Sequence, residues 1–272
     1  MATRFILINT SHAGNVGAAA RAMKVMGFDD LVLVAPRWPD VLAREETLQR
    51  ASGAGDVLEK ARVVATLDEA LDGVTYLCAT AMTPRDFGPA TASPREHLGG
   101  LAASAHHVAF LFGSERFGMS NDDVYRCHVA LTIPTDPRYG SLNLAAAIQV
   151  IAYEWRTALG GFSTNVATAP AAVRAEPVEA PAGPSTLRQA QGGPSSGRTD
   201  EVVLADAQSV AGMLAHWERA LQDIGFLDPA APKKLMPRLN QLFNRAQLTP
   251  EEIHILRGVA KAMSEARSRL KR

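Results

Sequence analysis

Cysteine, net charge and long apolar runs are what this sequence has least of. Its 272 residues include two cysteines, Cys78 and Cys127, and its 28 basic residues balance 28 acidic ones. Two cysteines without CxxC spacing, each in or beside an apolar run, predict reduced and buried thiols in a reducing compartment. The apolar run FILI at residues 5–8 is too short for a signal peptide, and no run reaches the length of a membrane span. We therefore expect a cytoplasmic protein that does not enter a membrane.

Several catalytic motifs are also missing. The sequence has no P-loop, no nucleophile elbow and no zinc-ligand spacing, and its seven histidines form no metal-binding pattern. These absences argue against the enzyme classes that depend on such motifs, and we expect no metal in the site.

The balanced charge conceals an uneven distribution. Residues 231–272, called here the basic tail, carry ten lysines and arginines against three glutamates, so their net charge is ten minus three, or +7. A basic segment on a neutral protein is typical of a phosphate-binding surface. A solvated helix face has the same composition, and charge alone leaves both interpretations open.

The first part of the chain alternates short apolar runs with helical segments. The runs are apolar nearly throughout, as in parallel strands that are covered on both faces, and they lie at 5–8, 31–34, 62–66, 74–80, 107–112 and 128–133. Candidate helix caps stand between them, namely Asn15, Thr66, Ser120 and either Ser141 or Asn143. This alternation predicts an α/β fold with an open parallel sheet.

Composition divides the chain into three parts. Residues 165–200 hold five prolines, four glycines and no aromatic residue, which predicts a flexible linker. The linker separates a domain at residues 1–164 from a small helical extension at residues 201–272. In the extension, helices are predicted at 207–226, 233–246 and from Pro250 onward; the first has an apolar stripe, and Thr249 begins a capping box for the last.

Polar or glycine-rich loops follow the carboxyl ends of four predicted strands, at 9–17, 80–93, 113–120 and 134–143. Ligands of open parallel sheets bind beyond these ends. Gly14 and Gly17 before a helix, with Arg37 after the second strand, allow an NADP-dependent reductase as one hypothesis. The spacing is GxxG rather than GxGxxG, so this signal is weak.

Three of these loop segments resemble the motifs of a known family when they are taken together and in order. NVGAAARAM, FLFGSERFGMSN and LTIPTDPRYGSLNLAAAI are similar to the three motifs of the SpoU-type branch of the SPOUT superfamily, RNA ribose 2′-O-methyltransferases. The similarity covers roughly residues 4 to 160. The segment LNQLFNRAQLTPEEIHILRG in the basic tail is similar to tRNA anticodon-loop methyltransferases of this branch.

The resemblance implies a SPOUT-type sheet with a C-terminal trefoil knot, S-adenosylmethionine as cofactor, a homodimer, and the anticodon stem-loop of tRNA as partner. It implies methyl transfer to the ribose 2′-OH of nucleotide 32, a cytidine or uridine. The cofactor-binding residues implied by the matching motifs are Thr80, Ala81, Met82, Gly113, Ile133, Gly140, Ser141, Leu142 and Asn143.

The same resemblance makes Arg21 the catalytic residue that acts on the target ribose, with Asn15 and Glu115 beside it. A guanidinium is a poor base, so positioning and charge stabilisation are the favoured roles of Arg21. Asn15 either caps its helix, contacts substrate or does both. Glu115 either holds Arg21 in place or pairs with Arg116.

Two further residues in the site loops carry open expectations. His12 is a candidate RNA contact. Thr83 stands where related sequences often have arginine, and Arg85 follows it, which leaves the substrate contacts of this loop open. A catalytically silent RNA-binding module that uses the basic tail is a third functional hypothesis.

Overall fold

The computed structural model describes residues 3–81, 83–162 and 203–270. Met82 and the predicted linker at 165–200 lie outside these residues. Met1–Gly161 and Val203–Arg272 form one compact unit. Within the described residues, no helix combines the length and the apolar character that crossing a membrane requires.

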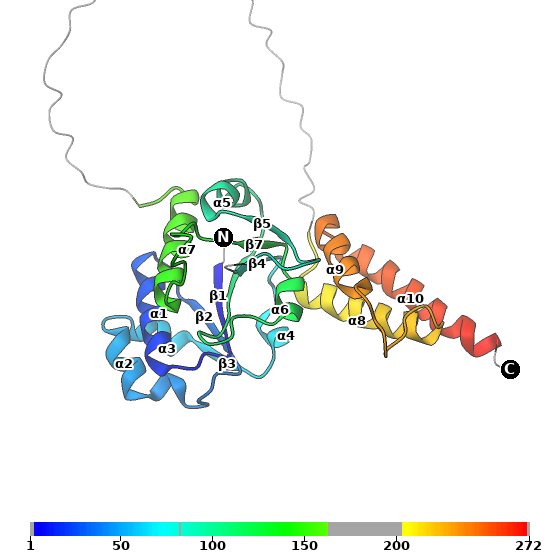
Figure 1. The fold of residues 1–272 in the computed structure, drawn as a ribbon, viewed down its shortest axis with the longest axis horizontal. Helices are drawn as coiled ribbons and strands as arrows, with labels where there is room; N and C mark the ends of the chain where they lie inside the picture. The colour runs from blue at the N-terminus through cyan, green and yellow to red at the C-terminus, as the bar shows by residue number, and fades with distance from the viewer. Residues whose placement is uncertain (1–2, 82, 163–202, 271–272) are drawn as a thin grey trace, which may run out of the picture. The chain divides into compact units, whose positions relative to one another are not determined.

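A seven-stranded, fully parallel sheet forms the centre of this unit (Figure 1). In the order β3-β2-β1-β6-β4-β7-β5, its strands are Arg62–Val64, Asp30–Val34, Thr3–Ile8, Val108–Phe112, Tyr76–Thr80, Val129–Leu131 and Ala90–Ala92. The predicted parallel α/β sheet is therefore confirmed. Strand β5 was not predicted, because the run ATA is short and carries little β-propensity.

Helices cover both faces of the sheet. The larger layer contains α1 (Ala13–Val25), α2 (Glu45–Ala51), α3 (Gly55–Lys60), α5 (Pro94–Ala102) and α7 (Leu144–Ala158), and η1 (Val41–Ala43) precedes α2. The smaller layer contains α4 (Leu67–Ala70) and α6 (Asn121–Tyr125). Helices α2, α3 and α5 were not predicted. Alternate strand residues point to opposite faces, so Phe5 and Leu7 join one core while Ile6 joins the other.

The predicted helix caps are confirmed in three cases and wrong in one. Thr66, Ser120 and Asn143 each accept a hydrogen bond from a backbone N–H in the first turn of the helix that follows. Asn15 does not cap α1, because that helix already begins at Ala13. Its side chain is therefore available for a different contact, described below.

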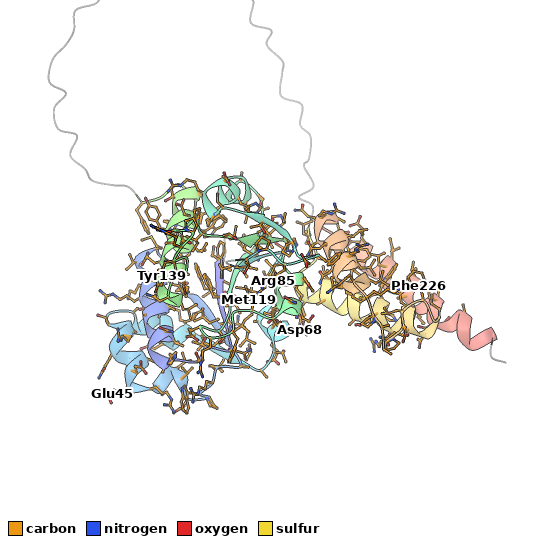
Figure 2. All side chains as sticks on the ribbon, viewed as in Figure 1. Glu45, Asp68, Arg85, Met119, Tyr139 and Phe226 are labelled. Carbon is orange, nitrogen blue, oxygen red and sulfur yellow. The ribbon has the colours of Figure 1, made fainter. Side chains whose placement is uncertain are left out.

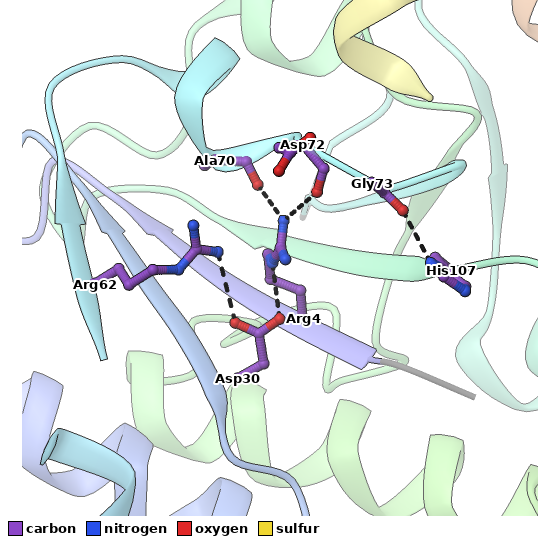
Figure 3. Close-up of polar contacts among 7 residues, drawn as sticks. All are labelled: Arg4, Asp30, Arg62, Ala70, Asp72, Gly73 and His107. Carbon is purple, nitrogen blue, oxygen red and sulfur yellow. Dashed lines mark hydrogen bonds and ion pairs between the residues drawn. The ribbon is translucent and has the colours of Figure 1, made fainter. Parts of the chain in front are cut away.

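Arg4 connects segments at the amino ends of the strands by hydrogen bonds (Figure 3). Its Nε donates to Asp30 at 2.8 Å, and one Nη donates to the backbone oxygens of Ala70 and Asp72, both at 2.8 Å. His107 makes a further contact with the backbone oxygen of Gly73 at 3.0 Å. These contacts hold the edge of the sheet that lies opposite the strand ends where the sequence predicts a ligand.

The buried cysteines follow the sequence prediction. Cys78 lies in β4 and Cys127 follows α6, and both are free and buried. Burial raises the pKa of each thiol, so both are protonated and unreactive at neutral pH.

The C-terminal helices form a core of their own. They are α8 (Ala207–Asp223), α9 (Leu235–Ala246) and α10 (Pro250–Leu270). Of the predicted stripe of α8, Val210, Leu214 and Trp217 face this core, and Leu221 is buried as well. The predicted capping box is confirmed, because Thr249 and Glu252 exchange backbone-to-side-chain hydrogen bonds at 2.8 and 3.3 Å.

Backbone groups of the sheet domain bind the same helices. The Asn244 side chain, only 6% exposed, donates to the backbone oxygens of Arg126 and Cys127 at 3.1 and 3.2 Å. The backbone N–H of Ala207 donates to the oxygen of Val74 at 2.7 Å. Buried polar contacts of this kind fix one packing arrangement, so the extension is part of the same compact unit.

Candidate active site

A cavity of about 570 Å³ lies beyond the carboxyl ends of β4, β6 and β7. Three loops line it, those after β4, β6 and β7, together with the first turns of α1 and α7. The predicted site residues in its wall are Asn15, Thr80, Ala81, Gly113, Glu115, Ile133, Gly140, Ser141, Leu142 and Asn143. Residues that are distant in the sequence thus meet at one place, because parallel strands end at the same edge of the sheet.

Glu115 is the centre of a hydrogen-bond cluster in this wall. Its Oε2 accepts from the backbone N–H and the hydroxyl of Ser11, at 2.8 and 2.6 Å, and its Oε1 accepts from the Asn15 amide at 2.7 Å. Burial acts to raise the pKa of Glu115, but the donors from Asn15 and Ser11 outweigh it and the pKa is lowered. Glu115 is therefore an anion that fixes Asn15 and the loop before α1.

This cluster corrects the expected partners of Glu115. Among the described residues the carboxylate binds Ser11 and Asn15, whereas no ion pair joins it to Arg21 or Arg116. The physical reason lies in α1, where Asn15 is in the first turn and Arg21 is six residues further along, about 9 Å down the helix axis.

The loop after β6 depends on a glycine. A Cβ on Gly113 would lie 2.2 Å from the backbone carbon of Gly118 and 2.3 Å from the nitrogen of Met119. Ser114 and Gly118 exchange two backbone hydrogen bonds, at 3.1 and 2.8 Å, and Gly118 has a φ of +68°. Only a residue without a side chain permits this turn to fold back onto the end of β6.

Hydrogen bonds connect the loop after β4 to the start of the loop after β7, and the end of β4 to β6. The Thr132 hydroxyl donates to the backbone oxygen of Ala81 at 2.8 Å, and the Thr80 hydroxyl donates to that of Leu111, also at 2.8 Å. Asn143 accepts from the backbone N–H of Ala146 at 2.8 Å and so starts α7 at the cavity wall. These bonds hold the loop backbones in fixed positions around the cavity.

The wall also contains residues that the sequence analysis did not commit to, among them Arg85, Met119 and Tyr139 (Figure 2). The Nε atom of Arg85 is buried and has no hydrogen-bond partner among the described residues. Tyr139 is 79% exposed at the rim. Tyr139 stands beside Gly140 in the third motif, so its position in the sequence indicated a residue of the site. Met119 could be assigned to the wall only once the fold of the 113–120 loop was known.

Arg21 does not line the cavity of its own chain. It is exposed on α1 and has no hydrogen bond or ion pair to the described residues. Two glycines that precede it on α1 have a packing role. A Cβ on Gly17 would lie 2.0 Å from the backbone oxygen of Thr47, and one on Gly14 would lie 2.5 Å from the Glu46 side chain. Both glycines therefore permit the close approach of α2 to α1.

Comparison with known proteins identifies the family. Residues 2–153 match the model of the SpoU rRNA Methylase family, which is more than half of the chain. The chain belongs to the SpoU methylase family. Residues 208–272 of this SpoU-family chain match a second model, described as the C-terminal domain of the tRNA methyltransferase TrmJ.

Similar proteins carry both parts of the chain. The tRNA (cytidine/uridine/adenosine-2′-O-)-methyltransferase TrmJ of Pseudomonas aeruginosa is 41% identical over 260 residues, which cover 94% of this chain and 91% of the relative. TrmJ of Photorhabdus laumondii is 36% identical, with 96% of each chain covered. Within the SpoU family, the chain therefore groups with the TrmJ proteins.

Solved structures give the same result for the fold. The crystal structure of TrmJ from Z. mobilis has a TM-score of 0.74 at 28% identity and covers 97% of this chain and 99% of its own. A probable methyltransferase from Bordetella pertussis is 48% identical over 58% of this chain and 95% of its own, with a TM-score of 0.54.

Proposed function

We propose that this SpoU-family protein is an S-adenosylmethionine-dependent tRNA methyltransferase that modifies the ribose 2′-OH of nucleotide 32 in the anticodon loop, in the cytoplasm. The observation that carries this proposal is the single cavity wall formed by residues of all three family motifs. The TrmJ relatives, named as tRNA 2′-O-methyltransferases, supply the substrate class and the reaction.

The cavity fits the proposed cofactor in size and in chemistry. Its volume of about 570 Å³ lies in the range of small-molecule sites. Leu131, Ile133 and Leu142 offer apolar surface to an adenine ring, and the buried Nε of Arg85 offers an unpartnered donor to a carboxylate. When bound, the cofactor supplies an electrophilic methyl group on a sulfonium sulfur.

The chain's own residues have the task of orienting the ribose. Arg21 binds the phosphate beside the target nucleotide and aligns its 2′-OH; because a guanidinium is a poor base, proton abstraction is not its main role. Asn15, held by Glu115, presents a fixed polar group at the cavity wall. Fixing both groups before the reaction lowers the entropic part of the barrier.

We propose a homodimer in which Arg21 of one chain serves the cavity of the other. Helices α1 and α7 pack side by side (Figure 1), and each presents an exposed apolar side chain, Val25 at 56% and Tyr153 at 52%. Together with the position of Arg21 outside its own cavity, this exposed surface supports a partner across α1 and α7.

Mixed dimers test this arrangement. Arg21→Ala chains and chains blocked in the cavity by Ser141→Trp are each expected to be inactive. Coexpressed and purified through two different tags, they should regain part of the activity, because one composite site is then intact. No recovery in a verified mixed dimer would mean that Arg21 acts within its own chain.

A trefoil knot belongs to the same proposal. Strand β7 lies between β4 and β5, two strands that are neighbours in sequence and are joined by residues 81–89. We propose that the chain after β7 passes through the connection between β4 and β5, which is the arrangement that a trefoil knot requires.

The basic tail is proposed to hold the tRNA backbone. Two of its cations, Lys234 and Arg238, lie 5.7 and 5.0 Å from the ring centroid of Phe87, in the loop after β4. Thr83 and Arg85 of that loop line the cavity. The proposed division of the chain is a methyltransferase domain at 1–164, a linker at 165–200 and a tRNA-binding extension at 201–272. The extension packs on the sheet domain.

The decisive experiment is methylation of a defined tRNA. Purified protein with labelled S-adenosylmethionine should methylate a tRNA that carries cytidine or uridine at position 32, and mapping should locate the product at that 2′-oxygen. The matched control is the same tRNA with a 2′-deoxynucleotide at position 32. Methylation of this control at the normal rate would show that another site is used.

The alternative functions give different results in ligand binding. An NADP-dependent reductase would have a higher melting temperature with NADP, since a ligand of the native state stabilises it. The packing of Gly14 and Gly17 against α2 explains these glycines without a dinucleotide. A silent RNA-binding module would bind tRNA and transfer no methyl group.

A further inference from the structure

A second hollow shares part of the 113–120 loop with the cavity. Its volume is about 510 Å³, and we call it the outer groove; it is lined by Asn9, Ser11, Ala35, Arg37, Ser114, Arg116, Phe117, Gly118, Met119 and Ser120. Ser114, Gly118 and Met119 line the cavity as well, so the loop is a shared wall. Molecules bound in the two hollows would therefore be neighbours.

The outer groove is cationic. Arg37 and Arg116 both line it and are exposed, and no carboxylate residue belongs to its lining. Among the described residues, neither guanidinium forms an ion pair. Two arginines without acidic partners in a concave surface provide a site for a phosphate group, which a guanidinium binds through paired hydrogen bonds.

An exposed aromatic ring stands at the rim of the outer groove. Phe117 is 84% exposed, and it is held at the tip of the tight turn that Ser114 and Gly118 close. The guanidinium of Arg116 lies 6.0 Å from the centre of its ring. A phenyl ring kept in water by a rigid turn is an unfavourable arrangement for the free protein, and it is suited to stacking on a nucleobase.

The floor of the outer groove is a fixed backbone. Asn9 and Ala35 adopt left-handed conformations, with φ of 54° and 43°, although alanine rarely does so. Their N–H groups are held by the backbone oxygens of Val34 and Val64, both at 2.9 Å. Hydrogen bonds at the ends of β1 and β2 thus maintain a strained surface beside the cavity.

We infer that the outer groove binds one nucleotide of the RNA substrate, adjacent to the nucleotide whose ribose enters the cavity. Its base stacks on Phe117, and its phosphate is held by Arg37 and Arg116. The groove therefore sets the register of the RNA, which decides the ribose that is methylated. This inference rests on the proposed function, since it requires RNA as the substrate.

The test uses the full-length protein and an anticodon stem-loop with the fluorescent base 2-aminopurine at position 31 or 33. Phe117→Ala should weaken RNA binding about tenfold and abolish the fluorescence quenching that stacking causes. Phe117→Tyr should retain both. Exchanging both arginines for glutamine, Arg37→Gln with Arg116→Gln, removes one phosphate contact and should lower the salt slope of binding by about 1.

Two controls separate this site from general effects. Leu48→Ala removes another exposed apolar side chain, 53% exposed on α2, and should change neither signal. S-adenosylmethionine affinity should stay constant in every variant. Wild-type methylation with unaltered RNA binding in the Phe117 and arginine variants would overturn the outer groove alone. A wild-type protein that neither binds nor methylates tRNA would overturn the proposed function together with it.

Discussion

Arg21 is set apart from every other residue of the proposed mechanism by its exposure and by its distance from the cofactor cavity. Asn15 and Glu115 line that cavity and bind each other at 2.7 Å, whereas Arg21 lies further along α1, outside it. Binding of the cofactor and positioning of the ribose are therefore assigned to different residues, and substitutions can separate them.

Arg21→Ala is expected to reduce the methylation rate by roughly 100-fold or more, the cost of removing one preorganised charged donor. Affinity for S-adenosylmethionine should stay unchanged. Arg21→Lys should fail nearly as badly, because an ammonium does not reproduce a planar, forked donor. Single-turnover rates and calorimetric affinities measure the two effects. A lysine variant with near-normal turnover would contradict the positioning role.

Glu115→Gln should destabilise the protein by about 1 kcal/mol at pH 7, because an amide nitrogen replaces one of two oxygens that accept from Ser11 and Asn15. This loss of stability is at the low end of the range for a hydrogen bond to a charged group, because Glu115 is only half-buried. Urea unfolding measures it, with the exposed Glu59→Gln as control.

The pH dependence of this difference follows from the lowered pKa of Glu115. A carboxyl with a lowered folded pKa stabilises above its unfolded value of about 4.3, and this contribution is lost as the pH falls through the folded pKa. The gap between wild type and Glu115→Gln should therefore be full at pH 7 and shrink below about pH 4. A constant gap would mean that charge is not its source.

At the scale of the element, the 113–120 loop is common to the two hollows. It supplies one wall to the cavity and one to the outer groove. A substitution that moves the loop should therefore affect cofactor and RNA together, whereas a substitution at its tip affects RNA alone.

Gly113→Ala should weaken S-adenosylmethionine binding and lower the melting temperature, because its Cβ would lie 2.2 Å from backbone that must then shift. The matched control is Gly99→Ala in α5, where the added Cβ meets no atom within 4 Å. Removing a helical glycine there should stabilise the protein by up to about 1 kcal/mol. Calorimetry and thermal unfolding measure both variants; unchanged cofactor affinity in Gly113→Ala would exclude the loop from the cofactor site.

At the scale of the whole molecule, the helical extension, which includes the basic tail, and the sheet domain are connected by buried contacts. Asn244 binds two carbonyl groups of the sheet domain, and Ala207 belongs to the core of its smaller layer. Deleting the extension would expose these groups and destabilise the sheet domain. A truncated protein that no longer binds tRNA would therefore not show whether unfolding or the loss of positive charge is the cause. Substitutions of exposed cations avoid this ambiguity.

Lys234→Gln with Arg238→Gln should weaken tRNA binding and lower its salt slope by about 1 for each phosphate contact that is lost. The control pair, Arg50→Gln with Lys60→Gln, changes the net charge equally on α2 and α3. Affinities at several salt concentrations provide the measurement. An identical loss in both pairs would indicate a general effect of charge rather than a contact of the basic tail.

The sequence by itself determined most of the strands, three helix starts and the edge of the sheet at which the cavity lies. Apolar runs identified six of the seven strands, and Thr66, Ser120 and Asn143 marked helix starts, because strand burial and capping depend on neighbours in the chain. The family motifs identified residues that line one cavity. Tertiary structure alone decided which side chains meet: Glu115 with Asn15 rather than Arg21, Gly17 against α2, and the exposed ring of Phe117 with Arg116. Such contacts depend on distances between segments up to a hundred residues apart, which local periodicity does not encode.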